Sequence, residues 1–146
     1  HTMSAIYENI VTREAAGLFV NMHFDYADEA VEITTDRDDQ ATLTVRPRTR
    51  DNIFIRVPGW APAESVEIDV DGIRVREIQM VGSFAYLASE QVHGGSEIVL
   101  RHALPDRRTV ETTATGDTYQ FAWCGDEVTG VHPNEWPMAF YPTLEL

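Results

Sequence analysis

Apolar and polar residues alternate along most of the chain. The clearest runs, in which every second residue is apolar, lie at residues 18–22, 31–33, 43–45, 53–57 and 66–70. A period of two places apolar side chains on one face of a strand and polar side chains on the other. These runs therefore predict half-buried antiparallel strands whose apolar residues face a core.

Short turn sequences separate these runs. Asp71-Gly72 divides two alternating stretches and is typical of a two-residue β-hairpin. Further turns are predicted at His93-Gly94-Gly95, Thr115-Gly116-Asp117 and Gly125-Asp126. Turns at intervals of roughly eight to twelve residues favour a sandwich or barrel. We therefore predict an all-β fold, a single-domain antiparallel β-sandwich of the jelly-roll or immunoglobulin-like type.

The two ends of the chain depart from this alternation. Residues 1–3 are interpreted as a cloning remnant, which predicts that the chain is cut from a longer protein. Residues 4–16 form an incoming segment whose pattern fits either a helix or a strand. The β-sandwich is assigned to residues 17–132. Residues 133–146 are rich in proline and predict an irregular tail along the surface.

Composition excludes several classes of partner. The chain has 146 residues, 43% of them hydrophobic, which is enough to build a core without a metal or a disulfide. Its 24 acidic and 11 basic residues give a net charge of -13. Such a surface repels nucleic-acid phosphates and anionic membranes, so neither is expected as a partner. The single cysteine, Cys124, excludes an internal disulfide. With no signal-peptide pattern in this stretch, a cytoplasmic location is favoured.

The chain offers little for catalysis or metal binding. Cys124 has no neighbouring base or cation to stabilise a thiolate, so it is interpreted as a packed thiol. The histidines lack the spacing of a metal site. The acidic run at residues 36–39 lacks the glycine and glutamate of a calcium-binding EF-hand loop. We therefore predict no catalytic residue, no metal ligand and no cofactor in this chain.

Three arginines form the most distinctive charged pattern. Arg46, Arg48 and Arg50 alternate, so a strand would place their guanidinium groups on one face. Pro47 lies between them and predicts an edge strand, because it donates no backbone hydrogen bond. The stripe can capture a carboxylate-bearing sugar or an acidic partner. It can equally protect the sheet edge and form ion pairs within an acidic domain, which is the interpretation that we favour.

Aromatic residues outside the predicted strands are candidates for binding. Trp60 lies in a proline-rich connector, and Trp136, Phe140 and Tyr141 lie in the tail. Their flat rings can stack on the faces of sugars. They can also pack against a neighbouring domain, which is the preferred interpretation if the chain is part of a longer protein.

Several segments, in this order, resemble the region that follows the catalytic barrel in β-L-arabinofuranosidase-type glycoside hydrolases (glycoside hydrolase family 127 and relatives). Residues 17–23, Gly-Leu-Phe-Val-Asn-Met-His, are similar to a Gly-Leu-Tyr-Val-Asn-Leu-Tyr strand of that family. Residues 54–61 resemble its Leu-Arg-Ile-Pro-Gly-Trp-Ala signature and carry the most specific part of the match. The tail at residues 121–142 also fits the family pattern.

Other segments resemble the family with substitutions. Residues 66–72 correspond to a Val-Asn-Gly hairpin, with Asp71 in place of the asparagine. Residues 82–104 resemble a run containing a tryptophan and a Gly-Asp pair. Val92 replaces that tryptophan, and Ser96 replaces that aspartate.

The resemblance implies a non-catalytic β-sandwich that accompanies an (α/α)6 barrel. In the family, a cysteine nucleophile beside zinc acts in the barrel, and none of those residues maps onto this chain. We therefore expect the chain alone to be inactive. It is predicted to be an accessory domain of a bacterial glycoside hydrolase, with Trp60 and the tail aromatics as its docking surface. The expected partners are the barrel of the same polypeptide, carbohydrate and, through an exposed apolar patch, a second copy.

Two other functions remain open at this point. An autonomous carbohydrate-binding module predicts a row of coplanar exposed aromatic rings, or a groove lined by the three arginines. A structural spacer domain predicts stiff links to repeated copies, and this sequence contains no internal repeat.

Overall fold

The computed structural model describes residues 2–136 and 138–146. His1 of the predicted cloning remnant and Pro137 of the predicted tail lie outside the described residues. The chain divides into two compact units, His1–His102 and Ala103–Leu146. This division differs from the predicted sandwich over residues 17–132, because the last three strands form a sheet of their own.

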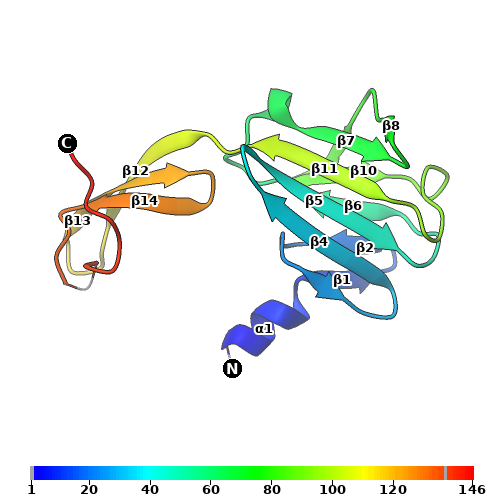
Figure 1. Ribbon diagram of the computed structural model, residues 1–146. Coiled ribbons are helices and arrows are strands. Elements are labelled where there is room, and N and C mark those ends of the chain that lie inside the picture. The colour runs from blue at the N-terminus through cyan, green and yellow to red at the C-terminus, as the bar shows by residue number, and fades with distance from the viewer. Residues whose placement is uncertain (1, 137) are drawn as a thin grey trace. The chain divides into compact units, whose positions relative to one another are not determined.

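Two sheets build the N-terminal unit (Figure 1). The first contains β1 (Val11–Glu14), β2 (Gly17–Val20), β6 (Ile53–Arg56), β9 (Gln79–Val81) and β10 (Phe84–Leu87). Its order is β1-β2-β6-β10-β9. The second contains β3 (Tyr26–Ala27), β4 (Val31–Arg37), β5 (Gln40–Pro47), β7 (Glu67–Val70), β8 (Ile73–Arg74) and β11 (Ile98–Ala103). Its order is β3-β4-β5-β11-β7-β8, so the all-β class is confirmed.

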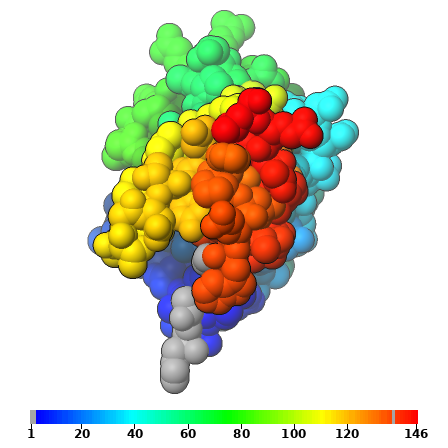
Figure 2. All heavy atoms as spheres, turned by 90° about the vertical axis from the view of Figure 1, so that its left-hand side faces the viewer, coloured from blue at the N-terminus to red at the C-terminus, as the bar shows by residue number. Residues whose placement is uncertain are grey.

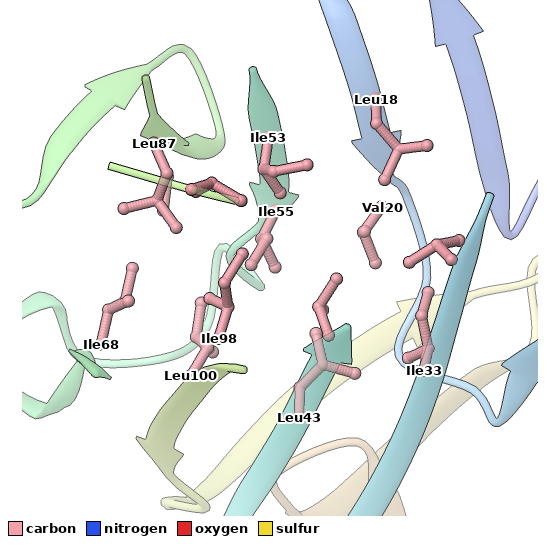
Figure 3. Close-up of a cluster of buried hydrophobic side chains, with 14 of the residues drawn as sticks. Leu18, Val20, Ile33, Leu43, Ile53, Ile55, Ile68, Leu87, Ile98 and Leu100 are labelled. Atoms are coloured by element: carbon pink, nitrogen blue, oxygen red, sulfur yellow. The ribbon is translucent and has the colours of Figure 1, made fainter. Parts of the chain in front are cut away.

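The core lies between these two sheets, as Figure 3 shows. Each sheet contributes alternate residues of its strands, and those labelled in Figure 3 are at most 2% exposed. They are Leu18, Val20, Ile53, Ile55 and Leu87 from the five-stranded sheet, and Ile33, Leu43, Ile68, Ile98 and Leu100 from the six-stranded sheet. The predicted apolar-inward alternation and the sandwich arrangement are therefore confirmed.

The incoming segment combines both forms that its pattern allows. Helix α1 (Thr2–Glu8) comes first, and β1 follows and pairs antiparallel with β2. The sandwich therefore begins before residue 17. A short 3-10 helix (Ala63–Ser65) follows the proline-rich connector. Pairing in the five-stranded sheet also departs from the prediction, because β2 and β6 run parallel.

The C-terminal unit is a three-stranded antiparallel sheet. Its strands are β12 (Asp106–Thr112), β13 (Thr118–Cys124) and β14 (Glu127–His132), in that order. The turns predicted at residues 115–117 and 125–126 connect them as hairpins. The tail adds one parallel bridge, because the Leu144 N–H donates to the Val131 carbonyl at 2.9 Å. In Figure 2 the red C-terminal residues lie against the orange residues of this sheet.

The Asp71-Gly72 hairpin joins β7 to β8 as predicted, with Val70 opposite Ile73. Both turn residues have positive φ, 51° for Asp71 and 77° for Gly72, as a type I′ turn requires. The Asp71 carboxylate accepts hydrogen bonds from the Glu97 N–H at 2.8 Å and from the Ser96 hydroxyl at 2.9 Å. These bonds favour the ionised form and hold the pKa of Asp71 below the usual value of an aspartate.

This hydrogen bonding predicts a loss of stability in acid. A carboxyl group whose pKa is lower in the folded state stabilises the fold above its unfolded pKa, and this contribution disappears as pH falls through the folded value. The pKa values of Asp25, Asp28 and Asp69 are also lowered. We therefore expect the free energy of unfolding, measured by urea denaturation, to decrease as pH falls below about 4.

Asp71→Asn should make this decrease shallower, because it removes one of the contributing carboxyl groups. Asp39→Asn is the matched control, since the exposed Asp39 carboxylate accepts no hydrogen bond from the described residues. If the free energy of unfolding of Asp71→Asn falls with pH as steeply as that of the wild type, Asp71 does not contribute to the acid sensitivity.

Candidate docking surface

Four aromatic side chains lie on the outer face of the five-stranded sheet. Each alternates with core residues on its strand, and neighbouring strands bring them into register. Phe54 of β6 is opposite Phe19 of β2 on one side and Tyr86 of β10 on the other. Phe84 lies two residues before Tyr86 on β10. We call Phe19, Phe54, Phe84 and Tyr86 the aromatic layer.

The rings of the aromatic layer pack mainly against one another. Phe19 and Phe54 are stacked, with ring centroids 4.3 Å apart and an interplanar angle of 3°. Tyr86 lies 5.0 Å from Phe54, and the Phe84 ring meets Phe19 edge-on at 5.3 Å. Phe54 is only 7% exposed, whereas the other three rings are half-buried. The faces of the central rings are therefore covered, and the layer presents apolar edges to its surroundings.

Polar groups fix the border of this layer. The Arg56 guanidinium lies over the Phe84 ring at 4.7 Å from its centroid. The Arg56 carbonyl accepts a hydrogen bond from His23 Nε2 at 2.7 Å. Asn52 Oδ1 accepts a hydrogen bond from the Ser89 N–H at 2.9 Å, and Asn52 Nδ2 donates to the Ala16 carbonyl at 2.9 Å. The surface that results is rigid and apolar, suited to contact with another apolar surface rather than to acid–base chemistry.

The prediction that Arg46, Arg48 and Arg50 share one strand face is wrong. Arg46 lies within β5, but β5 ends at Pro47 and the other two arginines lie in the bend that follows. β5 is also not an edge strand, because it pairs between β4 and β11. Pro47 is tolerated because it is the last residue of the strand, where its missing N–H interrupts no continuing ladder.

Each of these arginines has a separate internal partner. Arg46 Nη2 lies 2.8 Å from Glu97 Oε2. Arg48 Nε donates to the Asp28 carbonyl at 3.1 Å. Arg50 Nε donates to the Ser89 carbonyl at 2.6 Å. The geometry supports ion pairing and hydrogen bonding within the domain and does not form an arginine-lined groove.

The structure places the predicted docking aromatics in both units. Trp60 belongs to the N-terminal unit, where its half-buried ring meets His102 edge-on at 5.4 Å. In the C-terminal unit, Trp136 is 88% and Phe140 74% exposed. Tyr141 is half-buried and contacts the Phe121 ring at 6.4 Å. A docking role for these four residues remains a prediction.

A second aromatic row was not predicted from the sequence. Tyr119, Phe121 and Trp123 alternate along β13, with successive rings tilted by 42° and 41°. Trp123 Nε1 donates to Thr109 Oγ1 at 2.9 Å, and the Arg107 guanidinium lies 4.7 Å from the centroid of a Trp123 ring. These rings are not coplanar, so the row lacks the geometry that the carbohydrate-binding hypothesis requires.

The aromatic layer was also missed, although the sequence contains a signal for it. Phe19, Phe54 and Tyr86 each lie between two apolar residues, at positions where the alternation expects a polar side chain. Outward aromatic residues on several strands of one sheet can together form an apolar patch. The pairing of three strands far apart in the sequence, which brings these rings together, is not visible in that signal.

Cys124 is half-buried, and its thiol donates to the Leu104 carbonyl at 3.7 Å.

Within the described part of the chain, no three histidine, cysteine or acidic side chains gather in a group that could hold a metal ion. None of the described helices has the length and apolar character needed to cross a membrane.

Solved structures share this fold. The chain is similar to a GH127 β-L-arabinofuranosidase from Geobacillus stearothermophilus T6, with 20% identity and a TM-score of 0.55 over 86% of this chain. It is also similar to a glycoside hydrolase, with 14% identity and a TM-score of 0.50 over 81% of this chain. No protein-family model matches the chain, and no curated protein matches it.

The matched region is 22% of each of those two chains. This chain therefore has the fold of one part of larger glycoside hydrolases. The resemblance drawn from the sequence motifs is confirmed at the level of the fold.

Proposed function

We propose that this chain is a non-catalytic accessory domain of a glycoside hydrolase and braces an (α/α)6 catalytic barrel of the same polypeptide. The observation that carries the proposal is the aromatic layer, a rigid apolar surface on the outer face of a sheet whose inner face already covers the core. Single exposed apolar residues need no explanation, but four adjoining aromatic rings indicate an interface.

The packing of the rings favours a protein partner over a sugar. Stacking on a sugar requires an exposed ring face, as on the open side of a tryptophan or tyrosine. In this layer Phe54 is enclosed by Phe19 and Tyr86, and Arg56 covers Phe84. Ring edges bordered by a guanidinium suit the apolar side chains and helix carbonyl groups of a neighbouring domain.

The much greater length of the two matched glycoside hydrolases supports a partner within the same polypeptide. The chain spans about a fifth of the two glycoside hydrolases that share its fold, so most of each of those chains lies outside the matched region. A domain joined covalently to its partner needs only modest apolar contact, because the linkage keeps the effective concentration high. A layer of three half-buried rings around the buried Phe54 is consistent with such an interface.

A charge placed in the aromatic layer tests this proposal. Phe84→Glu puts a carboxylate into the interface and is expected to lower the unfolding midpoint of the native polypeptide more than that of the isolated 146-residue chain. Calorimetry on both proteins measures the difference. Val110→Glu is the control, since Val110 is 65% exposed on β12, outside the layer.

The Val110→Glu substitution should affect the two proteins equally. An equal drop in both proteins for Phe84→Glu as well would contradict docking through the aromatic layer.

A further inference from the structure

A groove of about 460 Å³ lies beside the β7–β8 hairpin of the N-terminal unit. It is separate from the aromatic layer, because β7 and β8 belong to the six-stranded sheet. Its apolar lining comes from Val70, Ile73 and Val75, and its polar lining includes Arg76 and His93. This volume is sufficient for a small ligand.

The walls of the groove are held in place by the fold. On one wall, both carboxylate oxygens of Asp71 accept hydrogen bonds from residues 96 and 97. On the other, the His93 N–H donates to Ser96 Oγ at 2.9 Å. Val92, which precedes His93, is completely buried in the core. The groove is therefore largely preformed, which lowers the entropic cost of binding.

Arg76 is the distinctive group in this groove. Its exposed guanidinium makes no hydrogen bond or ion pair with any residue that the structure describes. Its neighbour Arg74 differs, because it is bound to Asp69 at 2.6 Å and to Glu67 at 2.8 Å. In a chain of net charge -13, a guanidinium with no internal partner in a preformed groove is available to an anionic ligand.

We propose that this groove binds a carboxylate-bearing saccharide, with Arg76 holding the carboxylate. Guanidinium and carboxylate groups match in a planar two-bond arrangement. Gln91 also lines the groove, and its side-chain oxygen accepts the Ala88 N–H, which leaves its amide N–H groups to donate to sugar hydroxyls. The apolar residues provide contact for the C–H groups of a sugar ring.

Asp71 and Glu77, both in the lining, favour a singly charged carboxylate group at Arg76 over a phosphate dianion, because their negative charges oppose binding. The choice of a saccharide over another carboxylate rests on the proposed glycoside hydrolase function. The choice of a carboxylate rests on Arg76 alone. The three arginines first considered for this role are engaged elsewhere.

Titration of the 146-residue chain with the trisaccharide of galacturonic acid tests the proposal. Chemical-shift changes in the NMR spectrum should appear at residues of the groove at millimolar ligand, and the methyl ester of the same trisaccharide should bind more weakly. Arg76→Gln is expected to weaken binding by about tenfold. Arg108→Gln removes the same charge from β12 and should leave the affinity unchanged.

A variant with the opposite effect makes the test sharper. Glu77→Gln removes one of the two opposing charges in the lining and is expected to tighten binding by about two- to fivefold. The proposal is overturned if the groove resonances do not shift, if the ester binds equally well, or if Arg76→Gln behaves like Arg108→Gln. Acetate binding as tightly as the trisaccharide would rule out a saccharide site.

These titrations use the isolated chain and do not touch the aromatic layer. A titration without binding therefore does not affect the docking proposal. Likewise, if the Phe84→Glu comparison contradicts docking, the titration still tests the groove independently.

Discussion

Gly17→Ala is expected to lower the free energy of unfolding by about 3 kcal/mol or more, because both steric space and backbone conformation require glycine there. A Cβ atom at residue 17 would lie 2.3 Å from the backbone oxygen of Asn52. The φ angle of Gly17 is 148°, which side-chain-bearing residues rarely adopt. The same Asn52 oxygen accepts the Leu18 N–H at 2.9 Å, where β2 begins its parallel pairing with β6. The substitution therefore separates two central strands.

Gly82→Ala is the matched control for this substitution. Gly82 also has a positive φ, 58°, but a Cβ atom there would meet no atom within 4 Å. Only the backbone strain of a positive φ remains there, so the expected loss of unfolding free energy is about 1 kcal/mol. Urea denaturation of both variants separates this strain from the steric clash with Asn52. Equal losses would mean that the contact with Asn52 relaxes at little cost and that this strand pairing is not rigid.

Phe54→Ala is expected to cost about 3 kcal/mol, although Phe54 points away from the main core. Its side chain is 7% exposed and stacked on Phe19, so its removal leaves a cavity between neighbouring rings. Phe84→Ala, at a half-buried position of the same layer, should cost about 1 kcal/mol. Equilibrium unfolding in urea measures both losses.

The order of these two losses is the informative result. If Phe84→Ala were as costly as Phe54→Ala, the aromatic layer would be a second core of the isolated unit. It would then not be a surface that another domain completes.

The alternation of the sequence predicted the sandwich because residues such as Ile53 and Ile55 must face a core while their neighbours do not. The Asp71-Gly72 turn was predictable for a local reason, since two consecutive positive φ angles favour those residue types. The β12–β13 and β13–β14 hairpins were also predictable locally, because each turn contains a glycine with positive φ, Gly116 and Gly125. Each of these features depends only on residues close together in the sequence.

Features that depend on distant partners were not predictable in this way. The parallel pairing of β2 with β6 joins segments more than thirty residues apart, with no local pattern to specify it. Arg46 and Arg50 appeared to share a face because the end of β5 at Pro47 was not foreseen. The aromatic layer was missed for the same reason, since its rings meet only through the order of three strands.

Three departures from the motifs quoted above have defined places in the structure. Asp71 replaces an asparagine and Ser96 replaces an aspartate, and these two side chains are hydrogen-bonded at 2.9 Å. In this chain the carboxylate comes from the hairpin and the hydroxyl from the loop, and their hydrogen bond joins the two segments. Val92, which stands where the motif has a tryptophan, is completely buried in the core of this chain.

We propose that the aromatic layer is covered by another domain of the same polypeptide. Hydroxyl-radical labelling, read by mass spectrometry, reports the accessibility of Phe19, Phe84 and Tyr86 directly. We predict that these side chains react several-fold more slowly in the native polypeptide that carries this sequence than in the isolated chain, while Val110 reacts equally in both. Equal labelling of the three aromatic residues in the two proteins would show that no other domain covers the aromatic layer.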